Sequence, residues 1–81
     1  MKILLFGITR DIIDEGEVKA LSDELSQLGT VGNIREFLGE KYPGLKELSS
    51  LKIAVNQEFA MDSTKITKTD EIALIPPVSG G

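Results

Sequence analysis

The two most hydrophobic segments of the chain lie near its opposite ends, and they restrict the fold more than any other feature. Met1 to Ile8 is short, apolar and partly β-branched and aromatic, which is typical of a buried strand. Glu71 to Ile75 is a second such strand, and Pro76 ends it because proline cannot join a ladder in mid-sheet. Strands this hydrophobic favour the buried middle of a mixed sheet. We therefore expect these two strands to lie parallel at the centre of a sheet.

Between these strands, one segment has a clear helical pattern. From Thr30 to Tyr42 the apolar side chains fall on one helical face, Thr30 is a suitable N-cap, and a Pro-Gly pair follows as a stop signal. This helix is predicted to cover one face of the sheet. A shorter helix is predicted over Arg10 to Glu15, with Thr9 as its cap.

A β-hairpin is predicted before the last strand. Lys52 to Asn56 has alternating apolar positions, and Glu58 to Met61 would return as the second arm. Asn56-Gln57 suits the turn between them, because Asn tolerates a positive φ. A polar loop then leads to the last strand. The acidic pair Asp70-Glu71 at the end of this loop is expected to form a turn and not a general acid/base couple.

The segment from Glu17 to Leu28 has two interpretations. Its apolar residues fall at helical spacing, and Glu, Lys and Ala are helix formers. A sheet of three strands with one helix is thin, however. A second strand over Lys19 to Gln27, forming a hairpin with the first, would complete it. Topology and local propensity disagree here, and we favour the strand.

The composition argues against several functions. The chain has 81 residues, enough for one small domain, and its net charge of −4 is unsuited to nucleic acid or anionic membranes. It has no Cys and no His, so no thiolate or imidazole can act as nucleophile, base or metal ligand. Neither a metal site nor a self-contained active site is expected. The apolar run Ile3 to Ile8 is too short to span a bilayer and no signal peptide is evident, so a cytoplasmic location is expected.

The chain closes on Pro76-Pro77-Val78-Ser79-Gly80-Gly81. The two prolines fix φ and stiffen the stem, while the two glycines make the tip thin. The α-carboxylate is then carried by residues without side chains. Both a frayed terminus and a tip that enters a partner's narrow site are compatible with this pattern.

This ending resembles that of the molybdopterin synthase small subunit, a family of sulfur carriers in molybdenum cofactor biosynthesis. The family signature is an apolar strand, then Pro-Pro-Val, a small residue and Gly-Gly. Three further segments agree with the family: Phe6-Gly7 with Arg10, Thr30-Val31 with Ile34-Arg35, and Ala54-Val55-Asn56. The resemblance implies an α+β fold, the ubiquitin-like β-grasp, with a mixed sheet of about four to five strands packed on one main helix. Residues 1–75 would form this domain and residues 76–81 a flexible C-terminal tail.

The resemblance also implies a chemistry for the tail. An E1-like enzyme, carrying ATP and its metal, would adenylate the carboxylate of Gly81, and sulfur would then replace AMP to give a thiocarboxylate. The tail would insert into the large subunit of molybdopterin synthase and donate sulfur to cyclic pyranopterin monophosphate. Two small subunits would flank a dimer of large ones. The chain would bind no cofactor and would not be an enzyme on its own.

The resemblance assigns roles to particular residues. Gly81 would carry the reacting group, and Gly80 would keep the tip thin. Contacts with the partner are expected from Phe6, Phe59, Ile75, Pro76, Pro77, Val78 and Ser79. For Phe6, burial in the core and exposure at an interface both remain open, because it lies in the most hydrophobic strand. Arg10 is expected to pair with Asp14 one helical turn away, in preference to a partner's carboxylate.

Two other functions remain open from the sequence. One is a sulfur carrier that serves thiamine or tRNA thiolation, although such carriers usually lack the Pro-Pro-Val stem. The other is a ubiquitin-like modifier or binding module, in which Gly81 would be conjugated to lysines or never activated.

Overall fold

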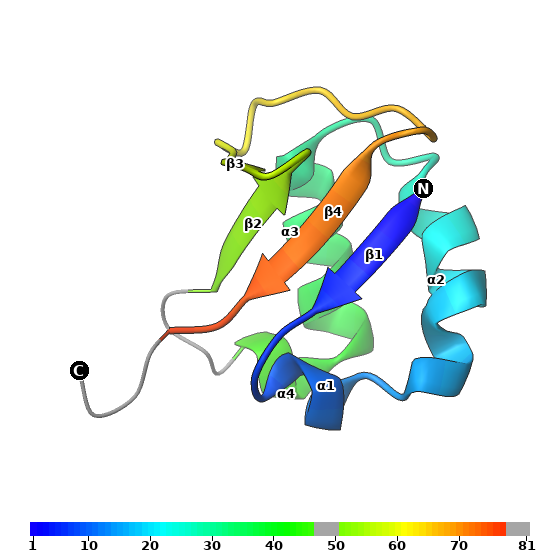
Figure 1. Cartoon of the computed structure of the whole chain (residues 1–81), viewed down its shortest axis with the longest axis vertical. Helices are drawn as coiled ribbons and strands as arrows, with labels where there is room; N and C mark the ends of the chain where they lie inside the picture. The colour runs from blue at the N-terminus through cyan, green and yellow to red at the C-terminus, as the bar shows by residue number, and fades with distance from the viewer. Residues whose placement is uncertain (47–50, 78–81) are drawn as a thin grey trace.

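The computed structural model describes residues 1–46 and 51–77. In chain order the elements are β1 (Lys2–Leu5), α1 (Thr9–Ile12), the 3₁₀ turn η1 (Glu15–Glu17), α2 (Val18–Leu25), α3 (Val31–Lys41), α4 (Pro43–Lys46), β2 (Lys52–Val55), β3 (Glu58–Phe59) and β4 (Glu71–Ile75). Among these residues, one mixed sheet has the strand order β1-β4-β2-β3, with α3 behind it in Figure 1. This arrangement agrees with the predicted β-grasp. No helix in the two described ranges is long and apolar enough to cross a membrane.

The strands nearest the two ends of the chain pair in parallel, as predicted, but only one of them is central. Ile3 of β1 lies opposite Ile72 of β4, and Leu5 lies opposite Leu74. β4 also pairs antiparallel with β2. β4 therefore has a neighbour on each side, whereas β1 is at the edge of the sheet. The prediction of a central position is wrong for β1, because its hydrophobicity reflects burial of one face and not a second neighbouring strand.

The segment that we predicted as a second strand, Lys19 to Gln27, is largely helical. α2 buries Leu21 and Leu25 completely. The helical spacing of its apolar side chains therefore outweighed the topological argument for a hairpin with β1. α2 lies alongside β1 in Figure 1, and the Ser22 hydroxyl donates a hydrogen bond to the Met1 carbonyl oxygen.

β2 and β3 form the predicted hairpin. Asn56 and Gln57 connect the two strands with φ angles of 52° and 70°, as expected for a two-residue turn whose twist matches that of the strands. β3 ends at Phe59, earlier than predicted. The Asn56 side chain donates to the Asp70 carboxylate and accepts from the Glu71 N–H. These bonds fix the turn to the start of β4.

α3 supplies the helical side of the core. Thr30 caps it as predicted, since its hydroxyl oxygen accepts a hydrogen bond from the Asn33 N–H at 3.2 Å. The helix buries Val31, Ile34 and Leu38. These side chains join the sheet residues Ile3, Ile53, Ile72 and Leu74 in one hydrophobic cluster.

Tyr42 closes this core just after α3. Its hydroxyl donates a hydrogen bond to the Glu17 carboxylate, with an O–O distance of 3.0 Å. Burial, followed by this bond and the Glu17 charge, raises the pKa of Tyr42 to about 12. The side chain therefore packs as a neutral phenol and links the end of α3 to η1.

The turn from β1 into α1 is held by Thr9. This residue is fully buried, and its hydroxyl both donates to the Phe6 carbonyl oxygen at 2.6 Å and accepts from the Phe6 N–H at 2.8 Å. Thr9 is thus the first residue of α1, while Ile8 is the N-cap. The helix ends at Ile12 and does not reach Glu15. The predicted capping role was wrong because the hydroxyl is engaged by the preceding turn.

Candidate partner-binding face

One face of the sheet packs against the helices and the other is open. Side chains alternate between the two faces along each strand. Ile53, Ile72 and Leu74 point to the helices and are at most 1% exposed. The residues between them point the opposite way. On this side, which we call the open face, the strands present Leu4, Ala54, Ala73 and Ile75.

The open face is apolar and hollowed. It contains a depression of about 200 Å³. The lining consists of Leu4, Phe6, Ala54, Gln57, Phe59, Glu71, Ala73 and Ile75. Ala54 and Ala73 are 4% and 8% exposed, although they face away from the helices. Small side chains between larger ones produce a hollow that suits an apolar side chain of a partner.

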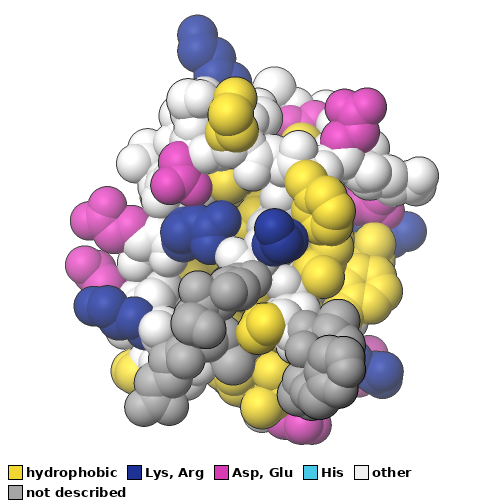
Figure 2. All heavy atoms as spheres, turned by 90° about the vertical axis from the view of Figure 1, so that its left-hand side faces the viewer, with side chains coloured by type: hydrophobic (Ala, Val, Ile, Leu, Met, Phe, Trp, Pro, Cys, Tyr) yellow, Lys and Arg dark blue, Asp and Glu magenta, His cyan; other side chains and the backbone are white. Residues whose placement is uncertain are grey.

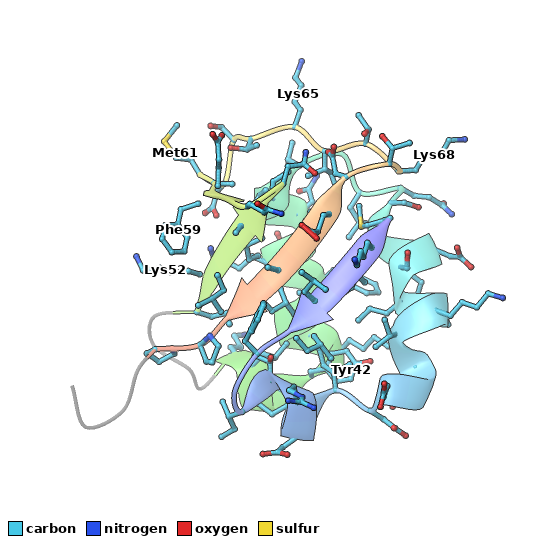
Figure 3. All side chains as sticks on the ribbon, viewed as in Figure 1. Tyr42, Lys52, Phe59, Met61, Lys65 and Lys68 are labelled. Atoms are coloured by element: carbon cyan, nitrogen blue, oxygen red, sulfur yellow. The ribbon has the colours of Figure 1, made fainter. Side chains whose placement is uncertain are left out.

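Phe6 and Phe59 line this depression and are exposed to solvent. Phe6 is 47% exposed and Phe59 is 70% exposed. Phe6 therefore belongs to the surface and not to the core. The Nζ atom of Lys52 lies 5.5 Å from the centroid of the Phe59 ring, a cation–π contact beside the β2–β3 hairpin (Figure 3). Viewed from the β2–β3 edge of the sheet, on the left of Figure 1, hydrophobic side chains lie next to Lys and Arg groups (Figure 2).

The predicted tail begins beside the open face. β4 ends at the half-buried Ile75, and the half-buried Pro76 follows it. A Cβ atom added to Gly7 would lie 3.0 Å from Cγ of Pro76, so the turn after β1 packs closely on this proline. Gly7 also has a φ of +54°, which L side chains rarely adopt. Pro77 is exposed. The remaining predicted site residues, Val78, Ser79, Gly80 and Gly81, lie outside the described residues.

Asp70 has the turn-forming role that the sequence predicted. Its carboxylate accepts hydrogen bonds from the Thr67 N–H at 2.7 Å and from the Asn56 side-chain amide at 3.0 Å. The backbone bond from Thr67, followed by the Asn56 bond, lowers the pKa of Asp70. A carboxylate stabilised in its charged form is unsuited to act as a general acid.

The predicted ion pair between Arg10 and Asp14 is not formed. Within residues 1–46 and 51–77, the ion pairs are Arg35–Asp62 and Lys41–Glu24. Asp14 instead accepts a hydrogen bond from the Gly16 N–H. The prediction failed because α1 ends before Asp14, so the two side chains do not share a helical face.

Three members of the open face, Leu4, Ala54 and Ala73, were not predicted as site residues. The available signal was the period-two alternation of a strand. Leu4 is two residues from Phe6, and Ala73 is two residues from Ile75. Once Phe6 and Ile75 are candidates for an interface, these neighbours follow on the same face.

The family of the chain follows from comparison with known proteins. A family model described as the ThiS family matches residues 3–81. The chain belongs to the ThiS family. The match covers the domain and the Pro-Pro-Val-Ser-Gly-Gly ending together, so this ThiS family member aligns along nearly its whole length.

Curated relatives of this ThiS family member share one name, molybdopterin synthase sulfur carrier subunit. The Mycobacterium tuberculosis protein is 37% identical over 82 residues, which covers 100% of this chain and 96% of the relative. The Arabidopsis thaliana protein is 34% identical over 82 residues, covering 100% of this chain and 82% of the relative. The Haemophilus influenzae protein is 32% identical over 84 residues, with coverages of 100% and 99%.

A solved structure supports the fold. The crystal structure of SAMP1 from Haloferax volcanii aligns with a TM-score of 0.65 and 23% sequence identity, covering 98% of this chain and 96% of that protein. The shared fold is the predicted β-grasp. At this identity the likeness establishes the fold of the ThiS family member and nothing about its partners.

Proposed function

We propose that this ThiS family member is the sulfur carrier subunit of a molybdopterin synthase. The observation that carries the proposal is the apolar open face adjoining Pro76, the first residue of the predicted tail. The full-length similarity to proteins named molybdopterin synthase sulfur carrier subunit supports it. In this proposal residues 1–75 are a docking domain and residues 76–81 are the carrier arm.

The reacting group in this proposal is the α-carboxylate of Gly81. The chain has no Cys to carry sulfur as a thiol or persulfide. A carboxylate is a poor electrophile, so it must first attack ATP, releasing pyrophosphate and forming an acyl adenylate. Sulfide from a donor then attacks the carbonyl carbon, AMP leaves, and a thiocarboxylate remains. Gly80 and Gly81 keep the tip narrow enough for a confined site.

The activating steps belong to a partner in this proposal. Adenylation needs ATP and its metal, and the chain has no Gly-rich phosphate loop with a Lys. We assign ATP binding to an E1-like enzyme and sulfur transfer to the large subunit, whose substrate is cyclic pyranopterin monophosphate. The chain binds no cofactor and is not a catalyst on its own. Two carrier subunits would flank a dimer of large subunits.

In this proposal the open face binds the surface of the partner, and the tail enters the partner's channel. Phe6, Phe59 and Ile75 supply exposed or half-exposed apolar area that excludes water at the interface. From Pro76 to Gly81 an extended chain spans roughly 19–20 Å at about 3.1–3.3 Å per residue. The stem residues Pro76, Pro77, Val78 and Ser79 would line the partner's channel. A face that docks beside an arm of this length can deliver Gly81 to a buried site.

Intact-mass measurement of the whole chain tests this function. The protein is incubated with an E1-like activating enzyme, ATP and a sulfur donor. We expect a mass gain equal to one sulfur-for-oxygen replacement, located on the C-terminal peptide. An unchanged mass, or a ladder of conjugates with other proteins, contradicts the carrier function, and the ladder favours a ubiquitin-like modifier. A further outcome is that the thiocarboxylated protein forms but does not convert cyclic pyranopterin monophosphate when a large subunit is added. That result would favour a carrier for thiamine or tRNA thiolation instead.

Two tail variants sharpen the test. Deletion of Gly81 should abolish sulfur loading and transfer while the thermal unfolding midpoint stays unchanged. Adding one alanine after Gly81 keeps every native residue but moves the carboxylate, and it should abolish transfer in the same way. An exposed variant away from the tail, Lys65→Ala, is the control and should load normally. Loss of folding on deletion of Gly81 would instead mean that the tail is structural.

A further inference from the structure

Within residues 1–46 and 51–77, the outer edge of β1 has backbone hydrogen-bonding groups without a partner. The Lys2 N–H donates to the Asp70 carbonyl oxygen at 3.1 Å, which fixes the register of the parallel ladder. In such a ladder every second residue bonds to the neighbouring strand, so Lys2 and Leu4 face β4. The N–H and C=O groups of Ile3 and Leu5 therefore point to the outer edge. No hydrogen bond among the described residues reaches them from that side.

A groove runs along this edge. It has a volume of about 710 Å³ and lies between β1 and the segment that carries α1, η1 and the start of α2. Its lining includes Ile3 and Leu5 on the strand side, with the buried Ile13 and the half-buried Val18 opposite. α2 packs against β1, and its Ser22 hydroxyl donates a hydrogen bond to the Met1 carbonyl oxygen just before the strand. The groove therefore combines exposed charged groups, a small apolar surface at Val18 and Leu5, and an unpaired strand edge.

The charges of the groove wall indicate what kind of chain would occupy it. Residues 10–17 carry one cation, Arg10, against the carboxylates of Asp11, Asp14, Glu15 and Glu17. Arg10, Asp11 and Glu15 line the groove and are exposed. None of these groups forms an ion pair within residues 1–46 and 51–77. A basic occupant would be attracted, whereas a second copy of this chain would bring two acidic walls together.

We propose that the β1 edge is a second docking site, which accepts an extended basic and apolar segment of a partner protein as an added strand. Backbone groups of the segment bond to Ile3 and Leu5, one apolar side chain enters the groove over the half-buried Val18, and flanking lysines or arginines meet Asp11 and Glu15. This mode of recognition obtains affinity from main-chain hydrogen bonds and specificity from alternate side chains. The site adjoins the depression on the open face, and Leu4 lines both.

The test is a titration of the full-length protein, labelled with ¹⁵N, with a blocked octapeptide of alternating valine and lysine. In the free protein the amides of Ile3 and Leu5 should exchange with solvent much faster than that of Leu4. The peptide should shift and protect the Ile3 and Leu5 amides, with a Kd on the order of 1 mM at low salt. The same peptide with alternate backbone amides methylated should not bind.

A charge-reversal pair with a matched control tests the chemistry of the occupant. Asp11→Lys with Glu15→Lys should weaken binding of the lysine peptide about tenfold. Glu36→Lys with Glu40→Lys changes the net charge equally on the exposed side of α3 and should change the Kd less than twofold. Equal weakening by both pairs, or slow exchange of Ile3 and Leu5 in the free protein, would overturn the proposal. Concentration-dependent dimerisation that protects the same amides would assign the edge to a second copy instead.

Discussion

The two faces of the sheet are built from neighbouring residues of the same strands, yet they have different properties. On the helix face, Ile72 and Leu74 of β4 are completely buried. On the open face of the same strand, Ala73 is nearly buried without any helix over it, and Ile75 is half-exposed. Phe6 and Phe59, the largest side chains on the open face, are 47% and 70% exposed. A stable fold has no need of exposed aromatic rings, which agrees with the proposed role of the open face in docking.

In this chain of only 81 residues, different faces of one sheet are therefore expected to serve stability and partner binding. Small domains bury a modest share of their surface, and most of what this one buries lies on the helix side. Substitutions on the helix face should therefore act on the free energy of unfolding. Substitutions on the open face should act on partner binding.

The largest effect is expected from the helix face of β4. Ile72→Ala removes a completely buried side chain from the central strand and should lower the free energy of unfolding by about 2–5 kcal/mol, measured by urea denaturation. Ile75→Ala, the same change on the open face of the same strand, should cost less than half as much. Equal losses from the two variants would mean that the faces do not differ in their contribution to stability. If Ile72→Ala does not fold, Ile72→Val gives a milder comparison at about 0.5–1.5 kcal/mol.

The next effect concerns recognition. Phe59→Ala should weaken binding to a molybdopterin synthase large subunit about 10- to 100-fold in calorimetric titrations, because an exposed aromatic ring on the proposed interface is lost. The free energy of unfolding should change by less than about 0.5 kcal/mol. Met61→Ala is the control, since Met61 is 73% exposed but does not line the depression. Comparable weakening by Met61→Ala would refute the assignment of the depression as the contact.

A smaller effect is expected from Tyr42 on the helix side. Its pKa is raised to about 12 in the folded chain, so the unfolded chain loses this proton first as the pH rises above 10. The contribution of Tyr42 to the free energy of unfolding should be fully present below pH 10. It should fall by up to about 2 kcal/mol as the pH rises through the pKa of the folded state. Tyr42→Phe should flatten this decline in urea denaturation series. Because Tyr42 is the single tyrosine and the chain has no Trp, ultraviolet titration reads its pKa directly; a midpoint near 10 would contradict the burial argument.

The smallest effect is expected at Arg35, which links α3 to two loops. Its Nε atom lies 3.1 Å from the Asp62 carboxylate, and both side chains are substantially exposed. Asp62→Ala should therefore change the free energy of unfolding by less than about 1 kcal/mol, and less in high salt. Arg35→Ala should cost more, because Nη1 also donates to the Leu51 carbonyl oxygen at 2.6 Å. Thermal melts at two salt concentrations distinguish the two contributions, and a larger loss from Asp62→Ala would show that the ion pair dominates.

Features coded by adjacent residues were predicted well. The Thr30 cap, the Asn56-Gln57 turn and the limits of β4 all depend on contacts within a few residues. Local hydrogen bonds and backbone preferences are sufficient to determine them. The Pro-Pro-Val ending likewise indicated the family without any knowledge of the fold.

Features set by distant contacts were predicted poorly. Two predictions were wrong for one reason: a central β1 and a strand over Lys19 to Gln27. The second strand would have paired with β1 and made it central, but this segment is largely helical. Whether Phe6 was core or surface could not be decided, because strand alternation separates two faces without showing which one the helices cover. Only the three-dimensional arrangement places α3 on the side of Ile3.

The parallel pairing of β1 with β4 also has a consequence for the order of folding. Ile3 meets Ile72 across nearly the whole length of the domain, so the loop closed by this contact is about as long as the chain allows. The entropic cost of closing this loop is incurred before the pairing gives any stabilisation. The helices and the β2–β3 hairpin can form from neighbouring residues, whereas β1 has to wait for β4. Until β4 has been synthesised, β1 therefore lacks the strand with which it pairs.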